Sequence, residues 1–220
     1  VSLSRVHFQG QFMQSKVQSG VIMKKAIPTC LILFMGLLSN STSAIEEPAY
    51  TVVHTWDEPE IEIRHYAPRL LAQTSMNSTE SNGFRILAGY IFGGNETEQE
   101  IAMTAPVQRT MGDSANATMA FVMPSELTLD ALPKPDDDRV QFIAEPAYHA
   151  AVIRFNGRAT ETQADAHWQT LFDFLATQSI VSTGPPTLNQ YNPPWTLPFM
   201  RRNEIIVPIQ SPNDDFQKTY

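Results

Sequence analysis

The chain has 220 residues, and its 15 lysines and arginines are outnumbered by 23 aspartates and glutamates, giving a formal net charge of −8. This acidic balance argues against binding to nucleic acid or to anionic lipid, because both attract basic protein surfaces. The one cysteine, Cys30, lies in an apolar stretch near the start, so the rest of the chain has no disulfide, thiol nucleophile or cysteine metal ligand.

The first recognisable pattern covers residues 23–44. It begins with Met23 and two lysines, continues with 13 almost wholly apolar residues, and ends in small residues at Ala44. This is the pattern of a secretory signal peptide, and the apolar run is shorter than the roughly 20 residues that span a bilayer. We expect cleavage near Ala44, no stable membrane span afterwards, and a periplasmic or secreted protein; the alternative is an uncleaved anchor. Residues 1–22 fit no targeting pattern. We therefore expect translation to start at Met23 and residues 1–22 to be an upstream extension assigned to the protein in error.

The remaining part, residues 45–220, is long enough for a single domain with a sizeable core. It holds 11 basic and 23 acidic residues, a net charge of −12. Apolar–polar alternation predicts strands, and apolar residues at helical spacing predict two helices, 81–92 and 162–178. The predicted strands are 50–56, 61–66, 69–76, 101–109, 117–123, 140–144, 148–155 and 205–209.

The order of these elements suggests a duplication, because a few strands around one helix occur twice. Two such halves predict an α+β domain with curved antiparallel sheets, possibly closed as a barrel, and two helices packed outside.

No strong catalytic motif is present. The chain lacks a G-x-S-x-G elbow, an H-E-x-x-H helix and a glycine-rich phosphate loop, which favours a binding protein over an enzyme. Its histidines after residue 44 are far apart in sequence and form no helical pair. His65 and His149 each alternate with apolar residues on a predicted strand, and half-buried histidines commonly have only a structural role.

The proline-rich passage 184–204 is the least ordinary part of the chain. It places aromatic side chains close to two arginines, and such a surface suits a flat apolar ligand that carries carboxylates. The alternative is a rigid loop that caps one end of a barrel, and both can hold at once. The candidate ligand-binding residues of this passage are Tyr191, Trp195, Phe199, Arg201 and Arg202.

Several ordered segments together resemble the SOUL haem-binding protein family. They are YTVVHTW, IEIRHYAP, FRILAGYIFGGN, IAMTAPV and YNPPWTLPFMRRNEI, and they extend from Tyr50 to Ile209. The resemblance implies a duplicated unit folded as a distorted eight-stranded barrel with two helices. It also implies binding of haem or a related tetrapyrrole in a largely apolar site, and we expect an exported bacterial member of the family.

The resemblance also implies a candidate iron ligand. In an animal member of the family, the histidine of an Arg-His-Tyr sequence has been proposed as the axial haem ligand, and Arg64-His65-Tyr66 matches that motif. His65 is therefore the metal-ligand candidate, with Arg201 and Arg202 as candidate partners for the haem propionates. If Ile61 and Ile63 point into the barrel, alternation requires His65 to point there too.

Three functions follow from these observations. The first is a non-catalytic haem or tetrapyrrole carrier. The second is a binder of another apolar small molecule without haem ligation, and the third is an enzyme that acts on a tetrapyrrole. The third has the least support, since no acid–base pair or nucleophile can be recognised.

Overall fold

The computed structural model describes residues 45–76, 80–112 and 116–212, so the expected signal peptide and upstream extension lie outside the described residues. The strands are β1 (Tyr50–Asp57), β2 (Glu60–Tyr66), β3 (Arg69–Ser75), β4 (Val107–Thr110), β5 (Thr118–Val122), β6 (Gln141–Glu145), β7 (Tyr148–Asn156), β8 (Thr187–Gln190) and β9 (Arg202–Ile209). The helices are α1 (Glu80–Ile91) and α2 (Glu161–Thr177), with the short 3₁₀ turns η3 (Leu129–Ala131) and η4 (Pro198–Met200).

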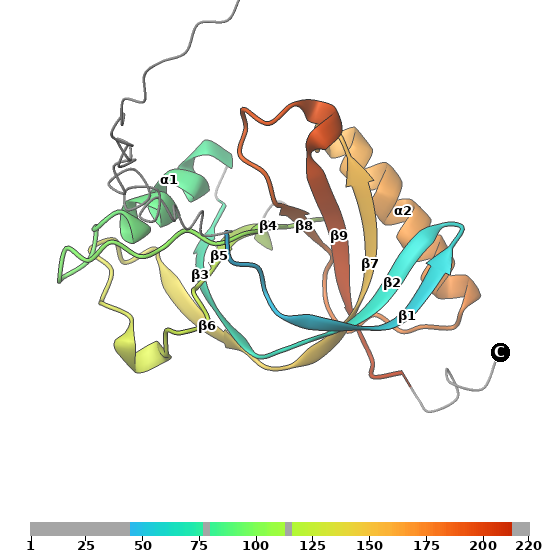
Figure 1. Ribbon diagram of the computed structural model, residues 1–220, viewed down its shortest axis with the longest axis horizontal. Helices are drawn as coiled ribbons and strands as arrows, with labels where there is room; N and C mark the ends of the chain where they lie inside the picture. The colour runs from blue at the N-terminus through green and yellow to red at the C-terminus, as the bar shows by residue number, and fades with distance from the viewer. Residues whose placement is uncertain (1–44, 77–79, 113–115, 213–220) are drawn as a thin grey trace, which may run out of the picture. The chain divides into compact units, whose positions relative to one another are not determined.

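All nine strands form one antiparallel sheet in the order β1-β2-β7-β9-β8-β4-β5-β3-β6. The sheet curls into a half-barrel, with α1 and α2 outside it (Figure 1). The predicted fold class is therefore confirmed, but the expected number of eight strands was one too few. The strand that the sequence pattern missed is β8, which lies in the proline-rich passage.

The sheet order reveals the duplication directly. The neighbours β3-β5-β4 of the first half repeat as β7-β9-β8 in the second, and β4 pairs with β8 where the halves meet. Each set of three strands is preceded in the chain by one strand that pairs with the opposite set. Strand β2, which precedes β3, pairs with β7, and β6, which precedes β7, pairs with β3. Strand β1 is an addition to this arrangement and pairs with β2. The two halves are therefore interlocked, which explains why they form one domain.

Each helix covers its own half of the outer face. Helix α1 packs on β3 and β5, and α2 packs on β7 and β9. The α2 side forms one apolar cluster that includes Ile61, Ile63, Leu171 and Leu175, and the α1 side forms a second. Alternation in the strands sends the intervening side chains to the inner face, where the core is smaller and more polar.

Helix α1 ends as its sequence predicts. The backbone turns at Gly93, whose φ of 97° is a conformation that glycine adopts without strain. Asn95 then fixes the following loop, because its side-chain nitrogen donates to the carbonyls of Tyr90 and Gln99. Its side-chain oxygen accepts from Thr97 and from the Gln99 amide.

We expect Asn95→Ala to lower the free energy of unfolding by about 1–3 kcal/mol, because Asn95 is only 2% exposed and its loss leaves buried groups unpaired. Urea denaturation followed by circular dichroism measures this loss. Gln169→Ala, which removes one exposed hydrogen bond to Asp173 on α2, is the matched control and should cost no more than about 0.5 kcal/mol. Equal effects of the two substitutions would contradict the role given to Asn95.

Candidate ligand pocket and inner-face network

The inner face of the sheet is built around a buried ion pair. Arg64 on β2 and Glu204 on β9 are 4% and 2% exposed, and two parallel hydrogen bonds of 2.9 and 3.2 Å join them. Burial alone would lower the pKa of Arg64, but its bonds to Glu204 and Tyr66 outweigh burial, so that the pKa is raised. Arg64 is therefore a fixed positive charge that Glu204 neutralises.

Tyrosines complete this inner-face network. The Tyr191 hydroxyl donates to Glu204 at 2.6 Å, and the Tyr66 hydroxyl accepts from Arg64 at 3.1 Å. Burial raises the pKa of Tyr66 to about 12, and burial together with the Glu204 charge raises the pKa of Tyr191. Both phenols stay protonated at neutral pH. The network uses its donors and acceptors internally, which is the behaviour of a structural element rather than of an open carboxylate-binding site.

A second arginine lies at the start of β3. The Arg69 side chain is 8% exposed, with Nε 2.5 Å from the Glu145 carboxylate and Nη2 donating to the Tyr148 hydroxyl at 2.7 Å. Its third nitrogen, Nη1, is buried and has no hydrogen-bond partner within the described residues. A buried donor of a charged group is costly to leave unpaired, so Nη1 is a point at which a ligand acceptor or a water molecule would stabilise the protein.

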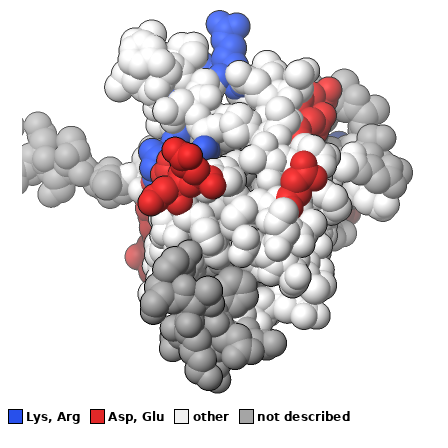
Figure 2. Space-filling model, turned by 90° about the vertical axis from the view of Figure 1, so that its right-hand side faces the viewer, with Lys and Arg blue, Asp and Glu red and all other residues white. Residues whose placement is uncertain are grey.

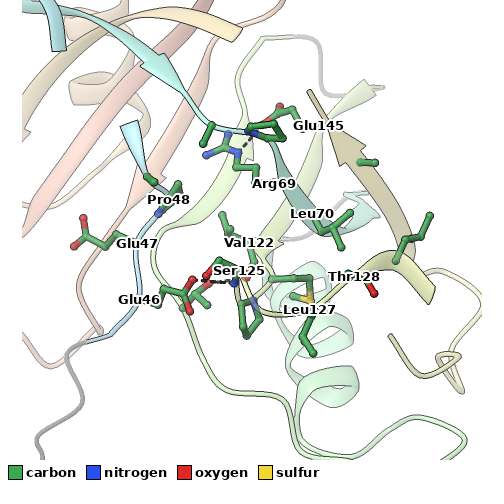
Figure 3. A pocket seen from close by; sticks show the side chains of 18 residues that line it. Glu46, Glu47, Pro48, Arg69, Leu70, Val122, Ser125, Leu127, Thr128 and Glu145 are labelled. Atoms are coloured by element: carbon green, nitrogen blue, oxygen red, sulfur yellow. Dashed lines mark hydrogen bonds and ion pairs between the residues drawn. The ribbon is translucent and has the colours of Figure 1, made fainter. Parts of the chain in front are cut away.

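Arg69 lines a pocket of about 410 Å³. The pocket lies where β3 begins and where β5 and β6 end, and it is closed on one side by residues 46–49 before β1. Figure 3 shows the Arg69–Glu145 ion pair on one side and the Glu46–Ser125 hydrogen bond on another, with apolar side chains around the space between them. The apolar wall includes Leu70, Val122, Met123, Leu127 and Leu129.

His65 does not line this pocket. Ile61 and Ile63 belong to the apolar cluster under α2, so the face of β2 that they share with His65 is the outer one. His65 is partly exposed at the end of that row, and its ring lies 4.6 Å from the ring of His149. Tyr66, the next residue, points to the inner face. His65 is therefore not among the residues that surround the pocket.

The proline-rich loop is rigid and mostly exposed. The Arg201 guanidinium donates to the Thr196 carbonyl at 2.8 Å and to the Pro194 carbonyl, so it braces the loop that contains it. Trp195 and Phe199 are 82% and 72% exposed. The large apolar side chains of the loop are therefore available at the surface, and its role as a cap of the barrel stays a prediction.

The remaining loop residues are engaged with the protein itself. Arg202 forms an ion pair with Glu47, and its guanidinium lies 3.6 Å from the centre of the Tyr191 ring. Tyr191 in turn bonds to Glu204. Neither residue forms an open site with Trp195, so the structure divides the predicted loop cluster into an inner and an outer part.

His65 and this loop lie at opposite ends of the sheet. His149 opposite His65 pairs with Ile209 at one end of β9, whereas Asn156 pairs with Arg202 at the other. Seven residue steps at about 3.3 Å each separate these ends by roughly 23 Å. In Figure 1 the loop is at the top of the molecule and the end of β9 at the bottom. One flat ring therefore cannot contact both His65 and Trp195.

Sequence reasoning missed the pocket because five separate stretches of chain build it. Arg69 and Glu145 are 76 positions apart and meet through the β3–β6 pairing. The Arg64–Glu204 pair spans 140 positions, and each of the two strands carries other charged residues, so the sequence alone did not single out this pair.

The described residues contain neither a cluster of metal ligands nor a membrane-spanning helix. Among residues 45–76, 80–112 and 116–212, no three side chains of histidine, cysteine, aspartate or glutamate converge as a metal site. Within the same ranges, neither helix has the length and apolar character needed to cross a bilayer.

Comparison with known proteins identifies the family. Residues 45–208 match the family model described as "SOUL heme-binding protein". The chain is 31% identical to "Heme-binding protein 2" of Homo sapiens over 160 residues, which cover 63% of this chain and 77% of the human protein. It is 32% identical to the Mus musculus protein of the same name over 141 residues, covering 55% of this chain and 68% of that protein.

One solved structure supports the fold. The C-terminal domain of EcmrR matches with a TM-score of 0.53 at 12% identity, covering 69% of this chain and 98% of that domain. Together with the match over residues 45–208, the comparisons lead to one conclusion: this chain belongs to the SOUL haem-binding protein family.

Proposed function

We propose that this protein is an exported, non-catalytic binder of haem or a related tetrapyrrole, and that the ring enters the 410 Å³ pocket at the start of β3. Membership of the SOUL family supports the class of ligand. The pocket carries the proposal, because a concave, mainly apolar space with a few polar groups is the usual form of a small-molecule site, and its volume lies in the typical range.

Arg69 is the proposed partner for a ring carboxylate. Two of its nitrogens are held by Glu145 and Tyr148, which fixes the guanidinium plane, and the third has no described partner. A carboxylate that reached Nη1 would form a charge-assisted hydrogen bond. Arg69 is preferred to Arg201, which bonds to two loop carbonyls, and to Arg202, whose buried Nε also has no described partner but which does not line the pocket.

In this proposal, His65 does not bind the iron of a ring in the pocket, because His65 is not among the residues that line it. Axial ligation by His65, and ring contacts by Trp195 and Phe199, remain predictions for binding at the protein surface. The non-catalytic role is supported by the lack of a recognisable acid–base pair or nucleophile, and export by the pattern of residues 23–44.

A hemin titration followed by the Soret band tests the proposal. Ala144 lines the pocket and is exposed, so Ala144→Trp fills the space without disturbing the core. We expect a saturable Soret shift in the wild type that is weakened at least about tenfold by Ala144→Trp, equivalent to about 1.4 kcal/mol. Gln141→Trp, at an exposed position of the same strand outside the pocket lining, is the control and should bind as the wild type does.

The same titration with His65→Ala separates the two modes of haem binding. A Soret spectrum that is unchanged in His65→Ala supports haem binding in the pocket without ligation by His65. If the Soret shift is lost in His65→Ala and kept in Ala144→Trp, the iron is bound at His65 and the pocket proposal is wrong. Recovery of unaltered haem after prolonged incubation tests the non-catalytic role, and formation of a modified tetrapyrrole would contradict it.

A second candidate function is binding of another apolar small molecule in the same pocket. Its support is the pocket lining, which includes the carboxylates of Glu46 and Glu47 and no histidine. These groups suit a neutral ligand better than one with two carboxylates. The discriminating result is that a neutral apolar fluorescent dye, N-phenyl-1-naphthylamine, binds the wild type, is excluded by Ala144→Trp and is not displaced by hemin.

A further inference from the structure

We propose that His65 and His149 together form a binding site for a divalent transition-metal ion such as Zn²⁺, Cu²⁺ or Ni²⁺. The two residues are direct partners in the antiparallel pairing of β2 with β7, and their rings are 4.6 Å apart, centre to centre. The site lies on the outer face, and neither histidine lines the pocket, so it does not depend on the proposed tetrapyrrole function.

Both imidazoles are available as ligands. In the part of the chain that the structure describes, neither ring has a hydrogen-bond partner, and each is only partly buried. The same row of the sheet continues with Thr51 on β1 and Ile209 on β9, which compete little for a ring nitrogen. Two adjacent histidines thus stand at the surface with free nitrogens and with ready access for an ion.

The electrostatics also favour the neutral, ligating form. Burial lowers the pKa of His149, and the neighbouring His65 lowers it further, because two positive rings directly opposite each other on a sheet repel. A metal ion needs the neutral imidazole and gains from a site that is not protonated at neutral pH. A metal ion bound by both neutral rings would remove the repulsion between the protonated imidazoles and add a favourable metal–nitrogen bond to each.

The geometry suits two ligands to one ion. Side chains directly opposite on antiparallel strands have Cβ atoms about 4.5–5.5 Å apart, and a metal–imidazole bond is about 2.0–2.1 Å, so small ring rotations bring one nitrogen of each to a common ion. Imidazole selects Zn²⁺, Cu²⁺ and Ni²⁺ over Mg²⁺ and Ca²⁺. No third side chain converges here among the described residues, so water or an external ligand would complete the coordination.

Calorimetric titration of the metal-free full chain with ZnCl₂ tests the site, and MgCl₂ is the ion that should not bind. We expect one saturable Zn²⁺ site whose affinity falls at least tenfold in His65→Ala and equally in His149→Ala. His167→Ala is the matched control, since that ring lies against Phe155 with Nδ1 at 2.8 Å from the Gln163 carbonyl. Zn²⁺ binding that survives His149→Ala, or no saturable binding, overturns the proposal.

A spectroscopic readout excludes a merely structural effect of the substitutions. Small amounts of Cu²⁺ should broaden the imidazole proton resonances of His65 and His149 together and leave those of His167 sharp. Broadening of only one of the pair would contradict a shared ion. Hemin binding should be unchanged in His149→Ala, so failure of the metal site and failure of the tetrapyrrole proposal give different results.

Discussion

Replacing Glu204 with alanine is expected to lower the free energy of unfolding by about 3–5 kcal/mol, the usual result of removing one partner of a buried ion pair. The expected loss is large because the buried positive charge of Arg64 remains after Glu204 is removed. Arg64 is 4% exposed and, as an arginine, stays protonated without Glu204, so among the described residues only the partly exposed Glu62 would remain as an opposite charge at bonding distance. Tyr191 would lose its acceptor as well.

Denaturation with urea at neutral pH measures this effect. Glu47→Ala removes a second arginine–glutamate pair, but its carboxylate is 41% exposed, so we expect a loss of no more than about 1 kcal/mol. The double variant Arg64→Met/Glu204→Leu should recover much of the loss, because no charge is left unpaired. If Glu204→Ala costs no more than Glu47→Ala, the inner-face network is not the stabilising feature described above.

Leu171→Ala is expected to cost about 2–5 kcal/mol, the range found for leucine truncation in a core. Leu171 is fully buried and lies in the apolar cluster that joins α2 to the outer face of the sheet. Its truncation would leave a cavity between the helix and strands β7 and β9.

The neighbouring residue provides the control for this prediction. Phe172 is 51% exposed and its ring contacts the edge of the core through Trp168, so Phe172→Ala should lower the free energy of unfolding by no more than about 1 kcal/mol. Figure 2, which views the molecule from the side where α2 lies in Figure 1, shows a surface with only scattered charged side chains. Similar losses for the two substitutions would mean that α2 is not anchored as described.

The helices were predictable from sequence because their apolar spacing is long and regular. The predictions of 81–92 and 162–178 differ from α1 and α2 by one residue at each end. Strand β8 was missed because it has only four residues. Its buried Asn189 and the partly buried Thr187 do not resemble a core strand, and the pairing with β4 and β9 that forms it is visible only in the fold.

The opposite error occurred before β4. A strand was expected over 101–109, but the regular strand begins at Val107, after the Ala105-Pro106 step. Proline has no amide hydrogen to donate to a neighbouring strand, so the apolar residues 101–106 pack without joining the sheet as a strand.

The candidate site was harder to predict than the fold. Alternation correctly placed Ile61, Ile63 and His65 on one face, but it could not say which side of the sheet that face is on. Both faces of β2 are buried, with the isoleucines under α2 and Arg64 and Tyr66 on the inner side. Only the position of α2 decides between them, and that depends on residues about 100 positions away.

The most direct test of the proposed function is a chemical-shift map of the backbone amides with gallium protoporphyrin IX, a diamagnetic analogue of haem. We expect shifts in the non-proline residues of 67–70, 122–125, 127–129 and 144–145, which line the pocket, and a clear response of the Arg69 side chain. Shifts confined to His65 and His149, or to residues 195–200, with the pocket resonances unchanged, would contradict the claim that the ring enters the pocket.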